Sequence, residues 1–430
     1  RIFQWIMRTT RWWDGLTRNF PGHRSAFRRT RRPDRQRATT PDSGARDVRD
    51  LIGACRPARP VTGPSEPRAP TSEEGHHVTP TRAPQHIYCG IDTHADTHHA
   101  AIITDTGILL AHRQFDTTSS AYDAVVEWIH QHGHPISVGI EGTSSYGAGI
   151  SRHLRHHHIA VVEVPRPNRK LRRSEGKSDP IDAEAAARAV LARHQLSEPK
   201  HGDGPIEAIR ALRVARSGAV KAATASMNTI RSMLVTAPEV LRTQLRGRST
   251  TALLDACIAL EPDTAAMTDP VNATIVALRS LAKRTRELRR EAQELKKNLA
   301  ALVKEVAPRT ASVFGLGPDT AAALLITVGD NPQRLRSESS FAHLCGVAPI
   351  PASSGKTNRH RLHRGGDRRA NQALHTAVVV RLRYSDIARR YAERRTSEGK
   401  SMPEIIRCQK RYLAREVFTA LRQDYRALTT

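Results

Sequence analysis

The sequence predicts an α/β domain followed by a mostly α-helical remainder. Two observations predict it: short apolar stretches separated by turn residues occur before residue 166, and from about residue 199 onward the apolar spacing is helical. Three strands in succession, then alternating helices and strands, are typical of a mixed sheet covered by helices. The expected strands lie at 87–91, 100–105, 108–116, 136–142 and 159–165.

The elements of the first domain follow from local patterns. The stretches AAIITD and ILLAHRQFD come directly after the first strand with turn residues between them, as in a meander. A helix is expected over 119–132, because Tyr122, Val125, Val126 and Ile129 recur at helical spacing. A second helix is expected at Ile150–His156, and a third begins near Asp179.

Composition shifts divide the chain into five parts. The first is rich in Arg, Pro, Thr and Ser without a lasting apolar period, which indicates a basic disordered extension. A sheet domain, a helical middle, a further domain and a helical tail follow. The expected boundaries are 1–84, 85–198, 199–307, 308–385 and 386–430.

The formal charge of +26 over 430 residues indicates a polyanionic partner, nucleic acid before an anionic membrane. Aromatic residues make up only 4%, which argues against a base-stacking platform. No apolar run is long enough for a membrane span, so no membrane partner is expected. The five cysteines form no CxxC pair, which indicates a reducing, cytoplasmic compartment and no cysteine zinc site.

The segment from Leu278 to Val306 carries a heptad pattern. One register holds Leu281, Leu288, Leu295 and Leu302, and its partner register holds Leu278, Thr285, Ala292, Leu299 and Val306. This pattern predicts a coiled coil and a homo-oligomer, a dimer or a tetramer. The alternative is a long helix packed within its own domain.

A glycine turn follows Pro308. Gly315-Leu316-Gly317 joins two apolar helical stretches, which is similar to a helix-hairpin-helix element whose backbone amides approach a phosphate. The alternative is a packing corner between two helices.

Four carboxylates stand at ends of elements in the first domain. Asp92 and Glu141 end expected strands, and Asp179 and Asp182 open a helix about one turn apart. Helix capping explains the last two equally simply. Four converging acids in a basic chain, however, suit hard divalent ions held about 4 Å apart for phosphoryl transfer.

The motifs GIDTHADTH, GIEGTSSYG and KSDPIDAEAAARAVL occur in the order and spacing of the DEDD transposases of the insertion-sequence 110/116 family. FAHLCGVAPIPASSGKTNRHRLHRGGDRRANQAL resembles that family's second catalytic domain, and the resemblance covers roughly residues 86 to 385. It implies a RuvC-like, ribonuclease-H-like mixed-sheet domain, a helical and coiled-coil middle, and a mostly α C-terminal catalytic domain. One departure is Thr93, where family members often carry an aromatic residue.

The resemblance implies that Asp92, Glu141, Asp179 and Asp182 form a metal-binding tetrad for Mg²⁺, a two-metal site with Mn²⁺ as the substitute. It also implies a serine nucleophile that attacks DNA and holds the strand as a phosphoserine. Ser354, directly before Gly355, is the expected nucleophile and Ser353 the alternative. By composition alone, SSGK is a flexible turn.

Two basic runs are expected to contact phosphates without reading sequence. The resemblance implies that readout is delegated to a structured bridge RNA that pairs with donor and target DNA, in a nucleoid-associated protein. The alternatives are a junction endonuclease that uses the tetrad alone and an inactive nucleic-acid-binding scaffold. The expected phosphate contacts are Arg166, Arg169, Lys170, Arg172, Arg173, Lys356, Arg359, Arg361, Arg364, Arg368 and Arg369.

Overall fold

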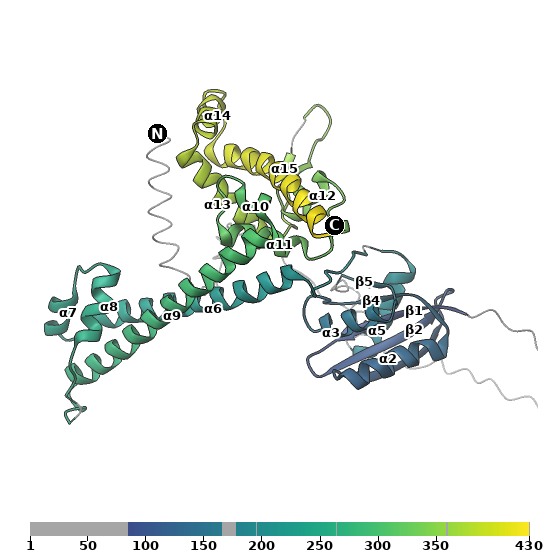
Figure 1. Cartoon of the computed structure of the whole chain (residues 1–430), viewed down its shortest axis with the longest axis horizontal. Helices are drawn as coiled ribbons and strands as arrows, with labels where there is room; N and C mark the ends of the chain where they lie inside the picture. Colours follow the sequence, from purple (N-terminus) through teal and green to yellow (C-terminus); the bar gives the residue numbers. More distant parts are fainter. Residues whose placement is uncertain (1–84, 166–177, 195, 264, 358–359, 430) are drawn as a thin grey trace, which may run out of the picture. The chain divides into compact units, whose positions relative to one another are not determined.

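A computed structural model describes residues 85–165, 178–194, 196–263, 265–357 and 360–429 (Figure 1). The first domain contains a five-stranded sheet in the order β3-β2-β1-β4-β5. The neighbouring pairs β1–β2 and β2–β3 are antiparallel, whereas β1–β4 and β4–β5 are parallel. This confirms the predicted mixed sheet. The strands are β1 (His86–Thr93), β2 (Thr97–Thr104), β3 (Leu109–Asp116), β4 (His134–Ile140) and β5 (Val161–Glu163).

Helices pack on both faces of this sheet because side chains alternate along β1. Ile87, Cys89 and Ile91 are fully buried in a core shared with α2 (Ser119–His132) and α3 (Ala148–His156). The residues between them face α5 (Asp179–Leu191). A Cβ added to Gly90 would lie only 2.2 Å from the backbone oxygen of Ala183, so this helix lies directly on the strand.

The strand boundaries differ from expectation at two places. The strand expected over 136–142 is β4, which ends at Ile140, so Glu141 follows the strand instead of ending it. The strand expected over 159–165 has only the three residues of β5. Hydrogen bonding to a neighbouring strand sets both limits, and apolar composition alone does not report it.

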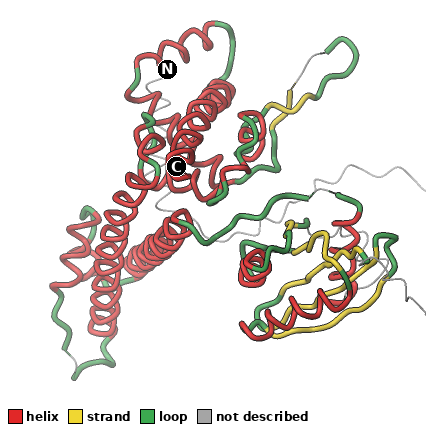
Figure 2. The backbone as a smooth tube through the Cα atoms, turned by 45° about the vertical axis from the view of Figure 1, so that its right-hand side comes forward, coloured by secondary structure: helices red, strands yellow, loops and turns green. Residues whose placement is uncertain are grey.

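The helical middle is built on two long helices, α6 (Pro205–Thr236) and α9 (Pro270–Val306), which run side by side in Figures 1 and 2. The shorter α7 (Glu239–Leu245) and α8 (Thr250–Ala259) pack at one end of this pair. None of the helices in the described ranges is both long and apolar enough to cross a membrane.

The two leucine registers of α9 have different environments. Leu278, Thr285, Ala292, Leu299 and Val306 are all buried, and Leu278 and Leu299 lie in cores shared with side chains of α6. The other register, Leu281, Leu288, Leu295 and Leu302, is only half-buried. One register therefore packs within the chain, as the alternative interpretation requires. Self-association through the other register stays a prediction.

The remaining helices share a single core. It contains Leu324, Phe341, Leu374 and Leu421, all at most 1% exposed, together with the ends of α6 and α9. The elements are α10 (Pro308–Ser312), α11 (Pro318–Val328), the 3-10 turn η1 (Pro332–Arg334), α12 (Glu338–Leu344), β6 (Pro349–Pro351), β7 (His360–Leu362), α13 (Arg368–Tyr384), α14 (Asp386–Ser397) and α15 (Met402–Thr429).

The glycine turn between α10 and α11 is tightly packed. Gly315 has a φ of +90°, and an added Cβ would lie 2.8 Å from the backbone oxygen of Ala377 in α13. The Gly317 amide donates a hydrogen bond to the Thr320 hydroxyl. These contacts suit a packing corner, and phosphate binding by a helix-hairpin-helix element stays a prediction.

Candidate active site

The β-sheet brings Asp92 and Glu141 to one edge. Ile91 of β1 pairs with Ile140 of β4, so Asp92 and Glu141 are the next residue along each of two parallel neighbours. The Glu141 amide donates to the Ile91 carbonyl at 3.4 Å. The Thr93 hydroxyl donates a hydrogen bond to the backbone oxygen of Glu141 at 2.8 Å. This bond helps to hold the Glu141 backbone next to the end of β1.

Helix α5 supplies the other two acids. Asp92 shares its strand face with Gly90, where α5 approaches most closely, and the first turn of α5 holds Asp179 and Asp182. Asp92 and Asp182 are buried, at 9% and 6% exposure. The N-cap residue of α5 is Ser178 and not Asp179, so capping does not explain the latter.

The electrostatics of Asp92 show that the four acids converge. Burial raises the pKa of the Asp92 carboxyl above its usual value, and the carboxylates of Asp182, Glu141 and Asp179 raise it further. Carboxylates gathered in this way repel one another unless a cation lies among them. The structure therefore gathers the predicted tetrad around Asp92.

His94 joins this cluster, although sequence reasoning did not single it out. Its Nε2 lies 3.3 Å from Asp92 Oδ2 and 3.3 Å from Asp179 Oδ1, and it lowers the pKa of Asp92. The signal was present in GIDTH, where His94 comes two residues after Asp92 and directly after the end of β1. Donor atoms of Asp92, His94 and Asp179 lie within 4.8 Å of one another, close enough to hold a metal ion.

The carboxylate oxygens suit a hard divalent cation. Mg²⁺ and Mn²⁺ prefer carboxylate ligands, whereas an imidazole nitrogen is more typical of softer metals. The donor set of this site is mainly oxygen, since four carboxylates accompany a single imidazole.

Ser354 lies at the tip of the β6–β7 hairpin. Its amide donates to Thr357 O at 3.2 Å, and the Thr357 amide donates back to Ser354 O at 3.0 Å. Gly355 between them has a φ of +53°, which explains a glycine at this turn. Both Ser353 and Ser354 are exposed, so the hairpin presents the serines to solvent.

The predicted basic residues separate into two groups. Those next to the hairpin are exposed. The others lie outside the described residues, so the structure does not bear on them. The first group is Lys356, Arg361, Arg364, Arg368 and Arg369; the second is Arg166, Arg169, Lys170, Arg172, Arg173 and Arg359.

Two protein-family models match this chain, one over the residues that hold the acids and one over the residues that hold the serines. A transposase family model of the IS110 DEDD type matches residues 89–237, which include all four acids. The model described as transposase, IS116/IS110/IS902 family, matches residues 307–393, which include Ser354.

Two relatives come from Streptomyces coelicolor. An uncharacterized 43.6 kDa protein of insertion element IS110 is 29% identical over 135 residues, 30% of this chain and 33% of that protein. The protein assigned as the transposase of the mini-circle element IS117 is 30% identical over 158 residues, 34% of this chain and 37% of that protein. The chain thus matches only about a third of each relative's length.

The two family models cover different parts of the chain, in the order in which the acids and the serine occur. Together they span more than half of its residues, and the sheet edge and the hairpin each fall inside one of them. The chain therefore belongs to the IS116/IS110/IS902 transposase family.

Proposed function

We propose that this protein is a DNA transposase that cleaves and rejoins strands by metal-assisted phosphoryl transfer. The observation that carries the proposal is the convergence of Asp182, Glu141 and Asp179 on the buried Asp92. The sheet order β3-β2-β1-β4-β5, with the acids at the ends of β1 and β4, supports a ribonuclease-H-like, RuvC-type domain.

The tetrad of Asp92, Glu141, Asp179 and Asp182 would hold two divalent ions, Mg²⁺ or Mn²⁺. Such ions lower the pKa of a bound hydroxyl or water and stabilise charge on a phosphate. Within the protein, α5 holds Asp182 against β1 and the Thr93 hydroxyl holds the Glu141 backbone. His94 bridges two of the acids and orients them.

Ser354 is the proposed nucleophile, with Ser353 as the alternative. Its Oγ would form a bond to the phosphorus of a DNA phosphodiester, and the bond to the leaving strand's oxygen would break. The serine proton passes to that oxygen, which leaves as a hydroxyl. Since the phosphoserine ester conserves the bond energy, a second strand hydroxyl can reverse the step without ATP.

The proposed partners are donor and target DNA, a structured guide RNA and further copies of the chain. The charge of +26 supplies phosphate contacts, which position a nucleic acid but do not read its sequence. Base pairing with an RNA would supply that readout. More than 170 residues separate Ser354 from the tetrad, and the two could act together across subunits. A DNA substrate places the protein in the cytoplasm, at the nucleoid.

The test compares Ser354→Ala, Ser353→Ala and Asp92→Asn in a strand-exchange assay with donor and target DNA and the RNA transcribed from the flanking element. We expect Ser354→Ala and Asp92→Asn each to lose at least about 10³-fold in strand transfer, and Ser353→Ala to remain active. A denaturing gel should show a covalent protein–DNA adduct for the wild type only.

Two outcomes would contradict this assignment. If Ser354→Ala still cuts branched DNA at the wild-type rate, the protein is a junction nuclease that uses the tetrad alone. If Asp92→Asn retains strand transfer, the metal centre is assigned wrongly. Sequencing the RNA that copurifies with the protein tests the guide separately from the chemistry.

A further inference from the structure

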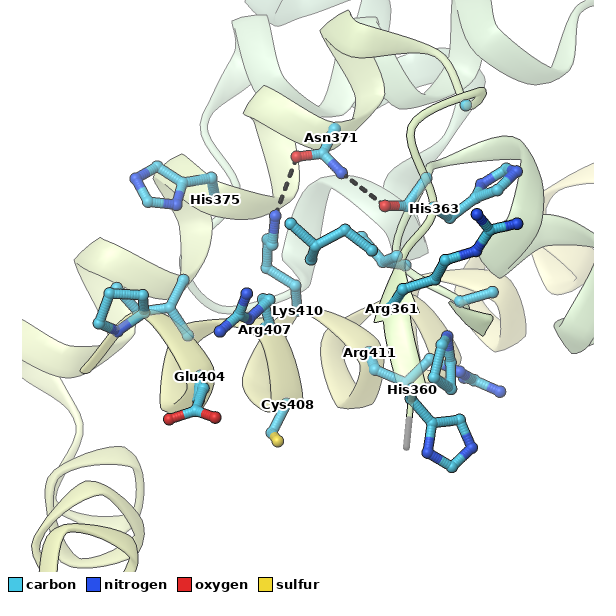
Figure 3. Close-up of a pocket in the computed structure, with 18 of the residues that line it drawn as sticks. His360, Arg361, His363, Asn371, His375, Glu404, Arg407, Cys408, Lys410 and Arg411 are labelled. Carbon is cyan, nitrogen blue, oxygen red and sulfur yellow. Dashed lines mark hydrogen bonds between the residues drawn. The ribbon is translucent and has the colours of Figure 1, made fainter. Parts of the chain in front are cut away.

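A cavity of about 1090 Å³ lies beside the serine hairpin, between the base of that hairpin, the start of α13 and the helix α15 (Figure 3). The helical tail that contains α15 carries no function predicted from the sequence. Figure 3 shows Arg407, Lys410 and Arg411 on this helix, and Arg361 and His363 on the hairpin side of the cavity. Both sides of the cavity therefore carry basic residues.

Lys410 is held in place at the centre of this cavity. Its Nζ donates to Asn371 Oδ1 at 2.9 Å, and the Asn371 amide nitrogen donates to the carbonyls of Cys345 and Gly346 at 3.0 and 2.9 Å. Because the asparagine is fixed by two backbone oxygens, it positions the ammonium without neutralising it. Burial lowers the pKa of Lys410, and the Arg407 guanidinium lowers it further.

Most of the surrounding charge is uncompensated. Arg411 pairs with Glu338, and Arg395 pairs with Glu398. Within the described residues, no carboxylate forms an ion pair with Arg407 or Lys410, or with Arg361, Arg364 and Arg368 of the hairpin side. The one acid that lines the cavity, Glu404, accepts hydrogen bonds from Ser401 and offsets part of the charge of Arg407 without forming an ion pair. The cavity therefore favours an anion with several charges.

Part of the lining is apolar. This part comes from Val347, Ala348, Pro349, Leu362 and Ile406. Apolar surface beside fixed cations suits a nucleotide, whose base and sugar cover apolar groups while its phosphate contacts the cations. Cavities of roughly 300–1,000 Å³ accept one drug-sized molecule, so this volume suits one or two unpaired nucleotides and not a duplex.

We propose that this cavity binds a single DNA strand next to the bond that Ser354 attacks, with phosphates on Lys410 and Arg407. The inference rests on the proposed function, because β6 leads from the cavity wall to the serine. Pro349 of β6 lines the cavity and is five residues from Ser354, a reach of at most about 17 Å.

Binding is tested on the full chain in EDTA, so that the metal chemistry does not contribute. A fluorescent ten-nucleotide oligo-dT is titrated against wild type, Lys410→Met, Arg407→Gln and the control Arg415→Gln. Arg415 is on the same helix, 65% exposed and outside the cavity lining, so its loss removes the same charge elsewhere, while its partner Glu338 keeps the ion pair with Arg411. We expect three- to tenfold weaker binding for the two cavity variants, with a salt slope smaller by about 0.7 for each lost phosphate contact. The control should change by less than twofold.

Cys408 gives a second readout that locates the strand. It lines the cavity and is half-buried, whereas Cys89, Cys257 and Cys345 are buried. Oligo-dT should slow its alkylation by N-ethylmaleimide at least threefold in wild type and leave it unchanged in Arg407→Gln. Peptide mass mapping identifies the modified cysteine. Arg407 is half-buried at the surface of α15, so this variant covers the case in which Lys410→Met fails to fold.

Three results would overturn the inference: unchanged oligo-dT affinity in both cavity variants, an equal loss in the control, or no protection of Cys408. If a ten-nucleotide oligo-U protects Cys408 and oligo-dT does not, the cavity belongs to RNA. These readouts need neither the tetrad nor Ser354. A failure here leaves the proposed function standing, and a failed strand-transfer assay leaves this binding result intact.

Discussion

Asp92 is the residue around which the other acids of the candidate site lie. Burial and three further acids raise the pKa of its carboxyl, so a cation beside it would stabilise the ionised form. His94 supplies part of that compensation, since it lies 3.3 Å from Asp92 and from Asp179. Because these acids repel one another, the cluster favours the binding of a divalent ion.

Replacing Asp92 by Asn should stabilise the metal-free protein, because it removes one charge from the acidic cluster. We expect about 1 kcal/mol in the free energy of unfolding at neutral pH, measured by thermal melting in EDTA. Mg²⁺ at ten times its dissociation constant should stabilise the wild type by about 1.4 kcal/mol and the variant by much less. An equal Mg²⁺ shift in both proteins would place the metal elsewhere.

Gly90 is the residue that lets α5 approach the sheet. Gly90→Ala should cost about 2–3 kcal/mol in stability and weaken Mg²⁺ binding, because its Cβ would lie 2.2 Å from backbone atoms of Ala183 and Ala187. Gly218→Ala is the matched control, since Gly218 in the middle of α6 has no atom within 4 Å of an added Cβ. That change should raise the free energy of unfolding by up to about 1 kcal/mol. Similar losses in both variants would contradict the close-packing argument.

At the scale of elements, the two apolar registers of α9 lie in different environments. Its buried register packs against α6, and its half-buried register leaves apolar surface partly accessible. A heptad pattern identifies both registers but does not say which one a neighbour covers, because any second helix satisfies the same spacing. The heptad pattern was therefore readable from the sequence, and the register that α6 covers was not.

Self-association is tested by substituting residues of the two registers in separate variants. Leu288→Lys and Leu295→Lys together should reduce the mass of the particle in light scattering while its melting temperature stays nearly constant. Leu299→Lys should instead lower stability by more than about 3 kcal/mol, because it buries a charge against α6. If the double variant keeps the wild-type mass, the outer register is not the oligomer interface.

The sheet shows a similar limit of sequence reasoning. The motifs GIDTH, GIEGTSSYG and KSDPID placed the four acids at element ends, and three of these acids raise the pKa of the fourth, Asp92. Glu141 nevertheless follows β4, and Thr93 supports its backbone. Such contacts depend on the register between strands far apart in the chain, which local composition does not encode.

At the scale of the whole molecule, α15 is part of the helical core and not an appendage. The Asp424 carboxylate accepts hydrogen bonds from the amides of Arg309 and Thr310 at 2.9 and 2.8 Å, and the Tyr425 hydroxyl donates to the Gly329 carbonyl. Leu413, Val417 and Leu421 are buried in the same core as α11 and α13. The predicted tail thus supports the elements on which the serine hairpin is built.

Removing residues 386–430 should consequently unfold the helical core. We expect loss of cooperative thermal unfolding and exposure of apolar surface, measured by circular dichroism and dye binding. Asp424→Ala is the milder variant and should cost about 1–3 kcal/mol, because it leaves two buried amides without an acceptor. A truncated protein that melts like the full chain would show that 386–430 is dispensable for folding.

Charge, heptad spacing and the order of the acidic and serine motifs were legible in the chain alone, because each is a local or compositional property. The contact of His94 with two acids, the covered face of α9 and the cavity that joins α15 to the serine hairpin were not. Each depends on side chains from segments distant in sequence that meet only when the core closes, and packing rather than local pattern decides which of them touch.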